Sequence, residues 1–237
     1  MGFLKSVLLI FGFSCGAWAF PTSTLWIPDD TALHPSTWRY DSRIAFTLDK
    51  RESDLGPQQP FIDQGLTFGF ANNGAIGLEA GIDWWEPEYG DDLKSLHGNL
   101  KVVILEEEIG FGVAFGFYNF GFKANGSDED FIYLGLGKQL GSLSHLFVGY
   151  FVGNQNVLLD EAGNSAARGI FGSISAKIGE KVKFVLDYQG GRSHRGALTS
   201  GFAFLLSQTS SISLGYVFYN NQSLVRDMML VKVDLEL

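Results

Sequence analysis

Large apolar residues recur at every second position along much of the chain, with small or polar residues between them. In residues 111–123, Phe and Val alternate with Gly112, Ala114 and Gly116. A period of two predicts a β-strand with one apolar face. The opposite face is nearly bare, whereas a half-solvated strand would carry Lys, Glu or Thr there. This stretch therefore predicts a strand whose bulky face needs an apolar environment.

The same alternation predicts about twelve strands and very little helix. The segments of residues 145–153 and 197–206 are apolar on both faces, so their register stays open. The predicted strands are 37–48, 64–71, 76–84, 96–105, 111–119, 131–139, 145–153, 168–178, 182–189, 197–206, 211–219 and 228–237.

The connections between these segments alternate between long and short. Residues 49–63 and 154–167 form long connections, whereas residues 72–75 and 179–181 form tight ones. An even number of antiparallel strands with tight turns at one end is typical of a bacterial transmembrane barrel. We therefore predict a closed antiparallel transmembrane β-barrel of about 12 strands, with short periplasmic turns and longer extracellular loops. A soluble β-sandwich or lipocalin-like barrel is the alternative, but the glycine-rich faces would suit solvent poorly.

Aromatic residues gather where the odd-numbered strands end, at the predicted outer boundary of the membrane. Amphipathic rings favour the headgroup level, so these residues predict an interfacial girdle. They are Trp84, Phe117, Tyr150, Tyr188 and Phe218.

With these features the chain resembles bacterial outer-membrane β-barrel proteins of the porin or channel type. The segment "TLWIPDDTALHPSTWRYD" (24–41) also resembles the lead into the first strand of uncharacterised exported barrels. The chain departs from the family at Leu237, where such barrels commonly end in an aromatic residue. The resemblance implies a location in the Gram-negative outer membrane. It also implies contact with membrane lipid, lipopolysaccharide and the barrel-assembly machinery.

The amino-terminal residues divide into two parts. Residues 1–19 predict a cleaved signal peptide, with Lys5 before an apolar run and Ala17-Trp18-Ala19 as the cleavage site. A retained membrane anchor and a lipoprotein at Cys15 are weaker alternatives. Residues 20–36 contain three prolines and precede the barrel of residues 37–237. We expect them either to plug the periplasmic mouth or to extend into the periplasm.

Composition narrows the function classes. The chain has 237 residues, enough for one large β domain, and its net charge of −9 argues against a nucleic-acid partner. Cys15 is the only cysteine and lies in the predicted signal, so we expect no disulfide in the mature protein.

Charged residues on the predicted inner faces are the candidates for selectivity. The inward charges number six basic and six acidic, and such balance favours structural ion pairs over a ring of one sign. Strands 1 and 12 must meet on closure, so Arg39 and Arg43 are expected to face Asp234 and Glu236. The lumen-lining candidates are Arg39, Arg43, Glu79, Asp83, Lys101, Asp187, Lys232 and Asp234.

Inward aromatic residues could form a stacking surface along which a sugar or an apolar solute passes. For a barrel of this size, the favoured interpretation is that these side chains simply fill the lumen as filler. The candidates are Tyr118, Tyr133, Phe151 and Tyr219.

The acidic residues Asp128, Glu129 and Asp130 match no defined calcium loop, so solvated loop acids are favoured over a cation site.

No motif indicates a catalytic residue, a cofactor or a metal site. Ser193, His194 and Ser200 are close in sequence, as a membrane-embedded lipid hydrolase would need, but they match no phospholipase pattern. The favoured function is a narrow passive channel for small solutes. The first alternative is a closed structural or assembly barrel, linked through its loops to a surface partner or to cell-surface polysaccharide. The lipid hydrolase is third.

Overall fold

The chain forms one barrel of twelve strands in a computed structural model, which describes residues 24–47, 60–86, 96–122 and 128–237. Within these residues no helix is long and apolar enough to cross a membrane. The one helix among the described elements is the short α2 (Glu106–Ile109). The strands are β1 (Trp38–Phe46), β2 (Phe61–Asn72), β3 (Ile76–Glu86), β4 (Leu96–Ile104), β5 (Gly112–Gly121), β6 (Phe131–Leu140), β7 (Ser144–Val152), β8 (Arg168–Lys177), β9 (Val182–Gln189), β10 (Ala197–Leu205), β11 (Ser210–Tyr219) and β12 (Met228–Glu236).

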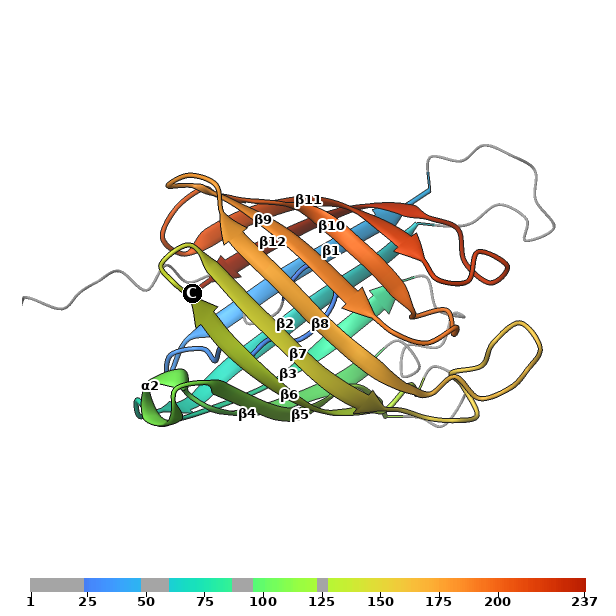
Figure 1. Ribbon diagram of the computed structural model, residues 1–237, viewed down its shortest axis with the longest axis horizontal. Helices are drawn as coiled ribbons and strands as arrows, with labels where there is room; N and C mark the ends of the chain where they lie inside the picture. Colours follow the sequence, from blue (N-terminus) through green and yellow to red (C-terminus); the bar gives the residue numbers. More distant parts are fainter. Residues whose placement is uncertain (1–23, 48–59, 87–95, 123–127) are drawn as a thin grey trace, which may run out of the picture.

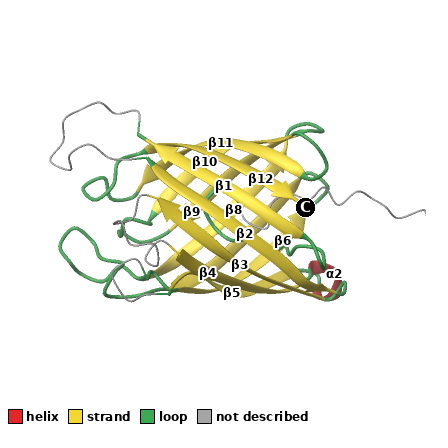
Figure 2. Ribbon diagram, turned by 180° about the vertical axis from the view of Figure 1, so that it is seen from behind, coloured by secondary structure: helices red, strands yellow, loops and turns green. Residues whose placement is uncertain are grey.

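Every strand pairs antiparallel with its neighbours in sequence, and β1 pairs with β12 to close the cylinder. The tilted strands wrap around one axis in Figures 1 and 2, with the larger loops at one end and the tight turns at the other. The backbone hydrogen bonds between Trp38 and Leu237 seal the barrel at the tight-turn end. A closed barrel leaves no strand edge unpaired, which is what a membrane interior requires. The predicted fold class is confirmed.

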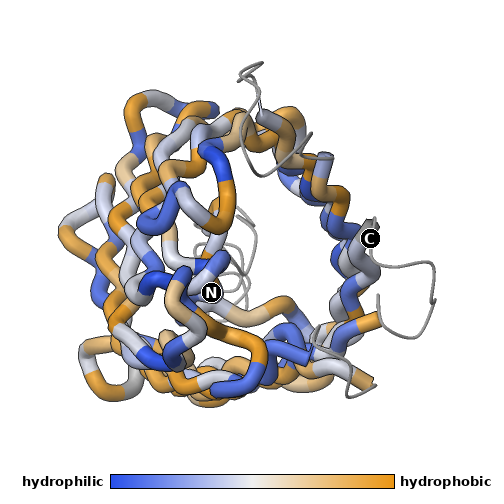
Figure 3. Tube along the Cα trace, turned by 90° about the vertical axis from the view of Figure 1, so that its right-hand side faces the viewer, coloured by the Kyte–Doolittle hydropathy of each residue, from blue (hydrophilic) through white to orange (hydrophobic). Residues whose placement is uncertain are grey.

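The strand faces with bulky apolar residues point outward, and the faces with small residues point into the barrel, as the alternation predicts. On β5, Gly112, Ala114 and Gly116 are buried inside the barrel, whereas Phe115 points outward and is 54% exposed. Exposed apolar residues recur on every strand, and Figure 3 shows the alternation of hydropathy around the ring. The outer surface is therefore an apolar belt that suits lipid.

Two irregularities change which residues reach the lumen. The register between β4 and β5 shifts so that β5 carries one extra residue, at Tyr118 and Asn119. Asn119 takes a positive φ of 54°, as bulge residues often do. Both side chains consequently turn toward the inside. The second shift lies between Gly69 and Ala71 on β2.

The predicted boundaries agree with the observed strands to within three residues. The largest difference is at β2, which begins at Phe61 rather than at residue 64. Asp63 is therefore a strand residue that faces the lumen, not a loop residue, and it is 3% exposed. The predicted signal peptide, residues 1–19, lies outside the described residues.

Candidate functional site

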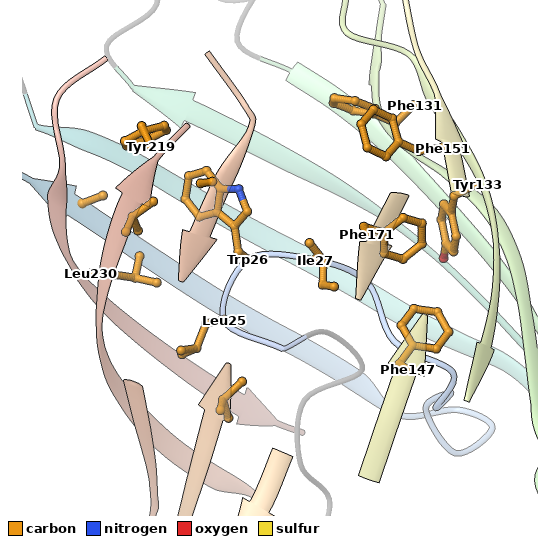
Figure 4. Close-up of a cluster of buried hydrophobic side chains, with 14 of the residues drawn as sticks. Leu25, Trp26, Ile27, Phe131, Tyr133, Phe147, Phe151, Phe171, Tyr219 and Leu230 are labelled. Carbon is orange, nitrogen blue, oxygen red and sulfur yellow. The ribbon is translucent and has the colours of Figure 1, made fainter. Parts of the chain in front are cut away.

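Residues 24–36 enter the lumen from the tight-turn end and run along its inside. A short turn, in which the Thr24 N–H donates to the Ile27 carbonyl at 3.0 Å, presents Trp26 at its tip. Leu25, Trp26 and Ile27 are 2%, 8% and 1% exposed. Figure 4 shows these three side chains between Tyr219 on one side of the barrel and Phe171 on the other. We call residues 24–36 the lumen segment.

Polar contacts hold the tip of the lumen segment. The backbone N–H of Trp26 donates to Asp187 Oδ2 at 2.8 Å, and Lys232 Nζ donates to the Thr24 carbonyl at 3.1 Å. The indole of Trp26 packs edge-on against Tyr219, with the ring centroids 6.0 Å apart. The tip is therefore fixed to β9, β11 and β12.

Ion pairs hold the rest of the lumen segment to the opposite wall. Asp29 lies 3.3 Å from Lys101 Nζ, and Asp30 lies 3.0 Å from the ring of His145. The Leu33 N–H donates to Glu79 Oε2 at 3.0 Å. Each partner sits on a different strand, so the segment bridges β3, β4 and β7.

The lumen has an aromatic half and a charged half. The aromatic half lies on β5 to β8, where Tyr118 stacks on Phe131 with centroids 4.6 Å apart. The rings of Phe147, Phe151 and Phe171 are almost fully buried beside them. Aromatic side chains thus fill this side of the barrel, as the filler interpretation predicts.

The charged half encloses a cavity of about 100 Å³ between the tip of the lumen segment and the wall of β1 to β5. Its lining combines Trp26 and Ile27 from the segment with charged, amide and hydroxyl side chains from the strands. The lining residues on the charged wall include Arg39, Arg43, Asp41, Asp63, Thr67, Glu79, Asp83, Asn99 and Lys101.

Three carboxylates share part of this wall. Arg43 reaches two of them, at 3.4 Å from Asp63 and 3.8 Å from Asp41. The side-chain amide of Asn99 donates to the third, Asp83. The neighbouring Lys101 pairs with Glu79 at 3.1 Å. The charged half is therefore a network of ion pairs rather than a ring of one sign.

A cluster from the long loops covers the cavity at its other end. Glu129 is 2% exposed, and its carboxylate accepts from Arg195 Nε at 2.6 Å and 2.8 Å and from Asn119 Nδ2 at 2.9 Å. The ring of His194 is 2.6 Å from the same carboxylate. We call Glu129, His194 and Arg195 the mouth cluster. The expectation that Glu129 is a solvated loop acid is wrong, because the loops fold inward and bury it against Arg195.

The mouth cluster sets the ionisation of Glu129. Burial alone would raise its pKa, but the charge of Arg195 and the hydrogen bonds from His194 and Arg195 outweigh burial and lower the pKa to about 2. Arg195 also lies with its Cζ 4.2 Å from the centre of the Trp85 ring, which stacks on His97. The carboxylate thus stays charged and keeps Arg195 over the cavity.

The structure brings the lumen-lining candidates to the inside of the barrel. Arg39, Glu79, Lys101, Asp187, Lys232 and Asp234 are buried there, and Arg43 and Asp83 are half-buried. Among the aromatic candidates, Tyr133, Phe151 and Tyr219 are buried and Tyr118 is half-buried. The girdle residues turn outward: Tyr150, Tyr188 and Phe218 are exposed, and Trp84 and Phe117 are half-buried.

The expected pairing across the β1–β12 seam holds only in part. Arg39 stands opposite Glu236 in the register, but Arg43 stands opposite Lys232 and not opposite an acid. Arg43 instead turns toward Asp63 on β2, and Lys232 pairs with Asp234 on its own strand at 3.2 Å. The two cations diverge because Arg43 finds a carboxylate on β2 and Lys232 finds one on its own strand.

Several residues of the site were missed by the sequence pattern. Asp63 and Trp85 lie beyond the ends of the predicted strands, although extending the alternation of β2 and β3 would have included them. Asn119 depends on the bulge, which no local signal marks. Arg195 and Glu129 are far apart in sequence, so their pairing depends on how the loops fold. Among the described residues, no group of three or more His, Cys, Asp or Glu side chains is arranged to hold a metal ion.

The barrel is similar to solved structures of outer-membrane proteins. The KdgM porin matches with 11% identity and a TM-score of 0.52, over 83% of this chain and 98% of that chain. The CymD monoaromatic hydrocarbon channel matches with 8% identity and a TM-score of 0.50, over 86% and 88%. Outer membrane phospholipase A from Escherichia coli matches with 12% identity and a TM-score of 0.50, over 88% and 94%.

No protein-family model matches the sequence, and a search of curated proteins finds no significant match. Channels and an enzyme share this barrel at low identity, so the likeness defines the fold and leaves the activity to the residues of the lumen. By its closed twelve-stranded antiparallel barrel, the chain resembles the porin-like proteins of the bacterial outer membrane.

Proposed function

We propose that the protein is a narrow outer-membrane channel for small polar solutes, constricted by its own lumen segment. The observation that carries this proposal is the cavity on the charged wall, which lies inside a closed barrel with an apolar outer belt. The proposal includes export through residues 1–19 and contact with membrane lipid and lipopolysaccharide. It also includes insertion by the barrel-assembly machinery.

The chemistry of the wall favours polar solutes. Ionised side chains such as Arg43 and Asp63 can replace the hydration of a polar solute, whereas an apolar solute would gain nothing from them. The aromatic half of the lumen is already filled by its own rings, so the route runs along β1 to β5. Its small volume supports passage of small molecules only.

A second candidate is a closed barrel that serves a structural or surface-binding role. It is favoured by the close packing of the lumen segment, since Leu25 and Ile27 are almost fully buried, and by the mouth cluster. In that case the long loops would carry the function and no solute would pass.

A lipid hydrolase receives less support from the geometry. A catalytic pair on this architecture must face lipid, yet His194 points to Glu129 at the mouth of the lumen. Ser200 lies on β10 between the buried Thr199 and Gly201, so its side chain has the opposite orientation to the lumen residues. Ser193 is 4% exposed, and its hydroxyl oxygen accepts from the Arg195 N–H at 3.4 Å.

Single-channel recording on purified protein tests the proposal. Thr67 is 6% exposed and lines the cavity, and the chain left after removal of residues 1–19 contains no cysteine. We expect stable current steps for the Thr67→Cys variant that fall when a trimethylammonium methanethiosulfonate reagent is added. Ser207→Cys, in an exposed turn, is the matched control and should keep its current. Absence of steps in the wild-type protein would favour the closed barrel instead.

A further inference from the structure

We propose that Asp41, Asp63 and Asp83 form a binding site for a primary ammonium group in the lumen cavity. The three carboxylates lie on β1, β2 and β3 and all line the cavity. The inference deepens the proposed channel function, on which it rests, because a channel with this site prefers amines and other small cations. We call the three residues the aspartate site.

The strand register makes two of these carboxylates converge. Gly65 pairs with Asp41 on one side and with Asp83 on the other. A Cβ atom placed on Gly65 would lie 2.6 Å from Oδ1 of each aspartate. Both oxygens therefore occupy the space over the glycine, and the absence of a side chain there is what admits them. Asp63 is two residues along β2 on the same face.

The arginines nearby leave one carboxylate oxygen of Asp63 without a hydrogen-bond donor. Arg43 is 3.8 Å from Asp41 and 3.4 Å from Asp63, and Arg39 is 4.0 Å from Asp41. These separations exceed those of charge-assisted hydrogen bonds, which are about 2.7–2.9 Å. Oδ1 of Asp63 is buried and has no hydrogen-bond partner among the described residues. A buried acceptor without a hydrogen-bond donor costs folding free energy, and a ligand that supplies a donor removes this cost.

The other cations that line the cavity are engaged by other acids. Lys101 pairs with Glu79 at 3.1 Å and with Asp29 at 3.3 Å, and Arg195 pairs with Glu129. Two arginines, Arg39 and Arg43, then face the three aspartates of the site. Within the described residues, the unpartnered Oδ1 of Asp63 favours a ligand that brings N–H donors to the three carboxylates.

An ammonium group satisfies this arrangement better than a metal ion or a neutral solute. It carries one charge and three N–H donors, which match converging carboxylate oxygens. The described residues offer no group suited to a metal ion. A cavity of roughly 150 Å³ in another protein accommodates benzene. The cavity of about 100 Å³ therefore suits a short alkylammonium ion.

Calorimetric titration of the full mature barrel in detergent tests the site without requiring conduction. The probes are butylammonium, butanol and butyrate, which share a chain length and differ in charge. We expect binding of butylammonium only. Loss of one charge-assisted contact in Asp63→Asn or Asp83→Asn should weaken this binding roughly tenfold. Glu236→Gln removes an equal charge from β12 outside the cavity lining and is the matched control, with unchanged affinity.

The outcomes separate this inference from the proposed function. Equal binding of butyrate, or butylammonium affinity that is the same in wild type, Asp63→Asn and Asp83→Asn, would overturn the aspartate site. Reversal potentials under a salt gradient give the second readout, with cation preference in wild type that falls in Asp63→Asn. A barrel that binds butylammonium but passes no current would keep the site and refute the channel. A barrel that conducts without cation preference and does not bind butylammonium would keep the channel and refute the aspartate site.

Discussion

The backbone N–H of Trp26 donates a hydrogen bond of 2.8 Å to Asp187 Oδ2, and this contact fixes the tip of the lumen segment to the wall of β9. The two residues are 161 positions apart in the chain. Lys232 Nζ and the Arg195 carbonyl also contact the tip, so Asp187 shares with them the anchoring of the segment inside the barrel.

Replacing Asp187 should loosen the lumen segment without opening the barrel. Asp187→Ala removes the acceptor, whereas Asp187→Asn keeps a carbonyl oxygen in the same place. We expect faster amide exchange in residues 24–30 of Asp187→Ala, measured by hydrogen–deuterium exchange and mass spectrometry, and near wild-type protection in Asp187→Asn. Rapid exchange of this segment in the wild-type protein would contradict its ordered position in the lumen.

The mouth cluster should make stability depend on acid pH. The pKa of Glu129 is lowered from 4.5 to about 2, against burial, by Arg195 and His194. Since the folded pKa lies below the unfolded one, the stabilisation is complete above about pH 4.5 and is lost as the pH falls toward 2. It amounts to about 3 kcal/mol at most.

The melting temperatures of wild type and Glu129→Gln from pH 7 to pH 2 check this dependence. We expect the wild-type advantage to be constant at neutral pH and to shrink in the acid window. A difference between the two proteins that does not change with pH would show that the carboxylate charge contributes nothing.

The aromatic half of the lumen should tolerate no added atoms. A Cβ on Gly135 would collide with the ring of Phe147, which is fully buried. Gly135→Ala should therefore destabilise the barrel by about 1–3 kcal/mol, the usual cost of overpacking. Gly179→Ala is the control, because nothing lies within 4 Å of its added Cβ. Equal denaturant midpoints for the two variants would mean that the aromatic side is loosely packed.

A charged residue on the apolar outer belt should destabilise the barrel more near the middle of the membrane than near its interface. Leu134 is 54% exposed near the middle of β6, and Leu140 is 50% exposed at its end. In lipid, Leu134→Arg should cost about 2–4 kcal/mol, whereas Leu140→Arg near the interface should cost about 0–1 kcal/mol. Unfolding from lipid vesicles measures both. Similar small costs at the two positions would indicate that this face meets water.

Local alternation was enough to predict the barrel. The Phe and Gly faces of β5 and the tight turns define strands whose faces differ, and an even strand number is typical of the closed bacterial barrels. The lining candidates followed from the same parity, so Glu79, Lys101 and Lys232 were found from the sequence. Asp63 was missed because the predicted strand began at residue 64, one position after Asp63.

The remaining parts of the site depend on contacts between distant residues. The sequence did not decide whether the Pro-containing segment around Trp26 enters the lumen. The residues that bind this segment, Asp187 and Lys232, lie far along the chain on β9 and β12. Arg195 meets Glu129 only after two loops fold over the mouth. Such contacts follow from the closed barrel and leave no periodic signal in the sequence.

The single-channel current of wild type compared with Trp26→Ala tests the central claim most directly. Trp26 is 8% exposed at the tip of the lumen segment and borders the cavity, so its truncation should widen the route. Trp38→Ala, on the outer face, is the control. We predict small steps in wild type and in Trp38→Ala, and larger steps in Trp26→Ala. Steps of equal size in all three proteins, or no current in any of them, would contradict a channel constricted by residues 24–36.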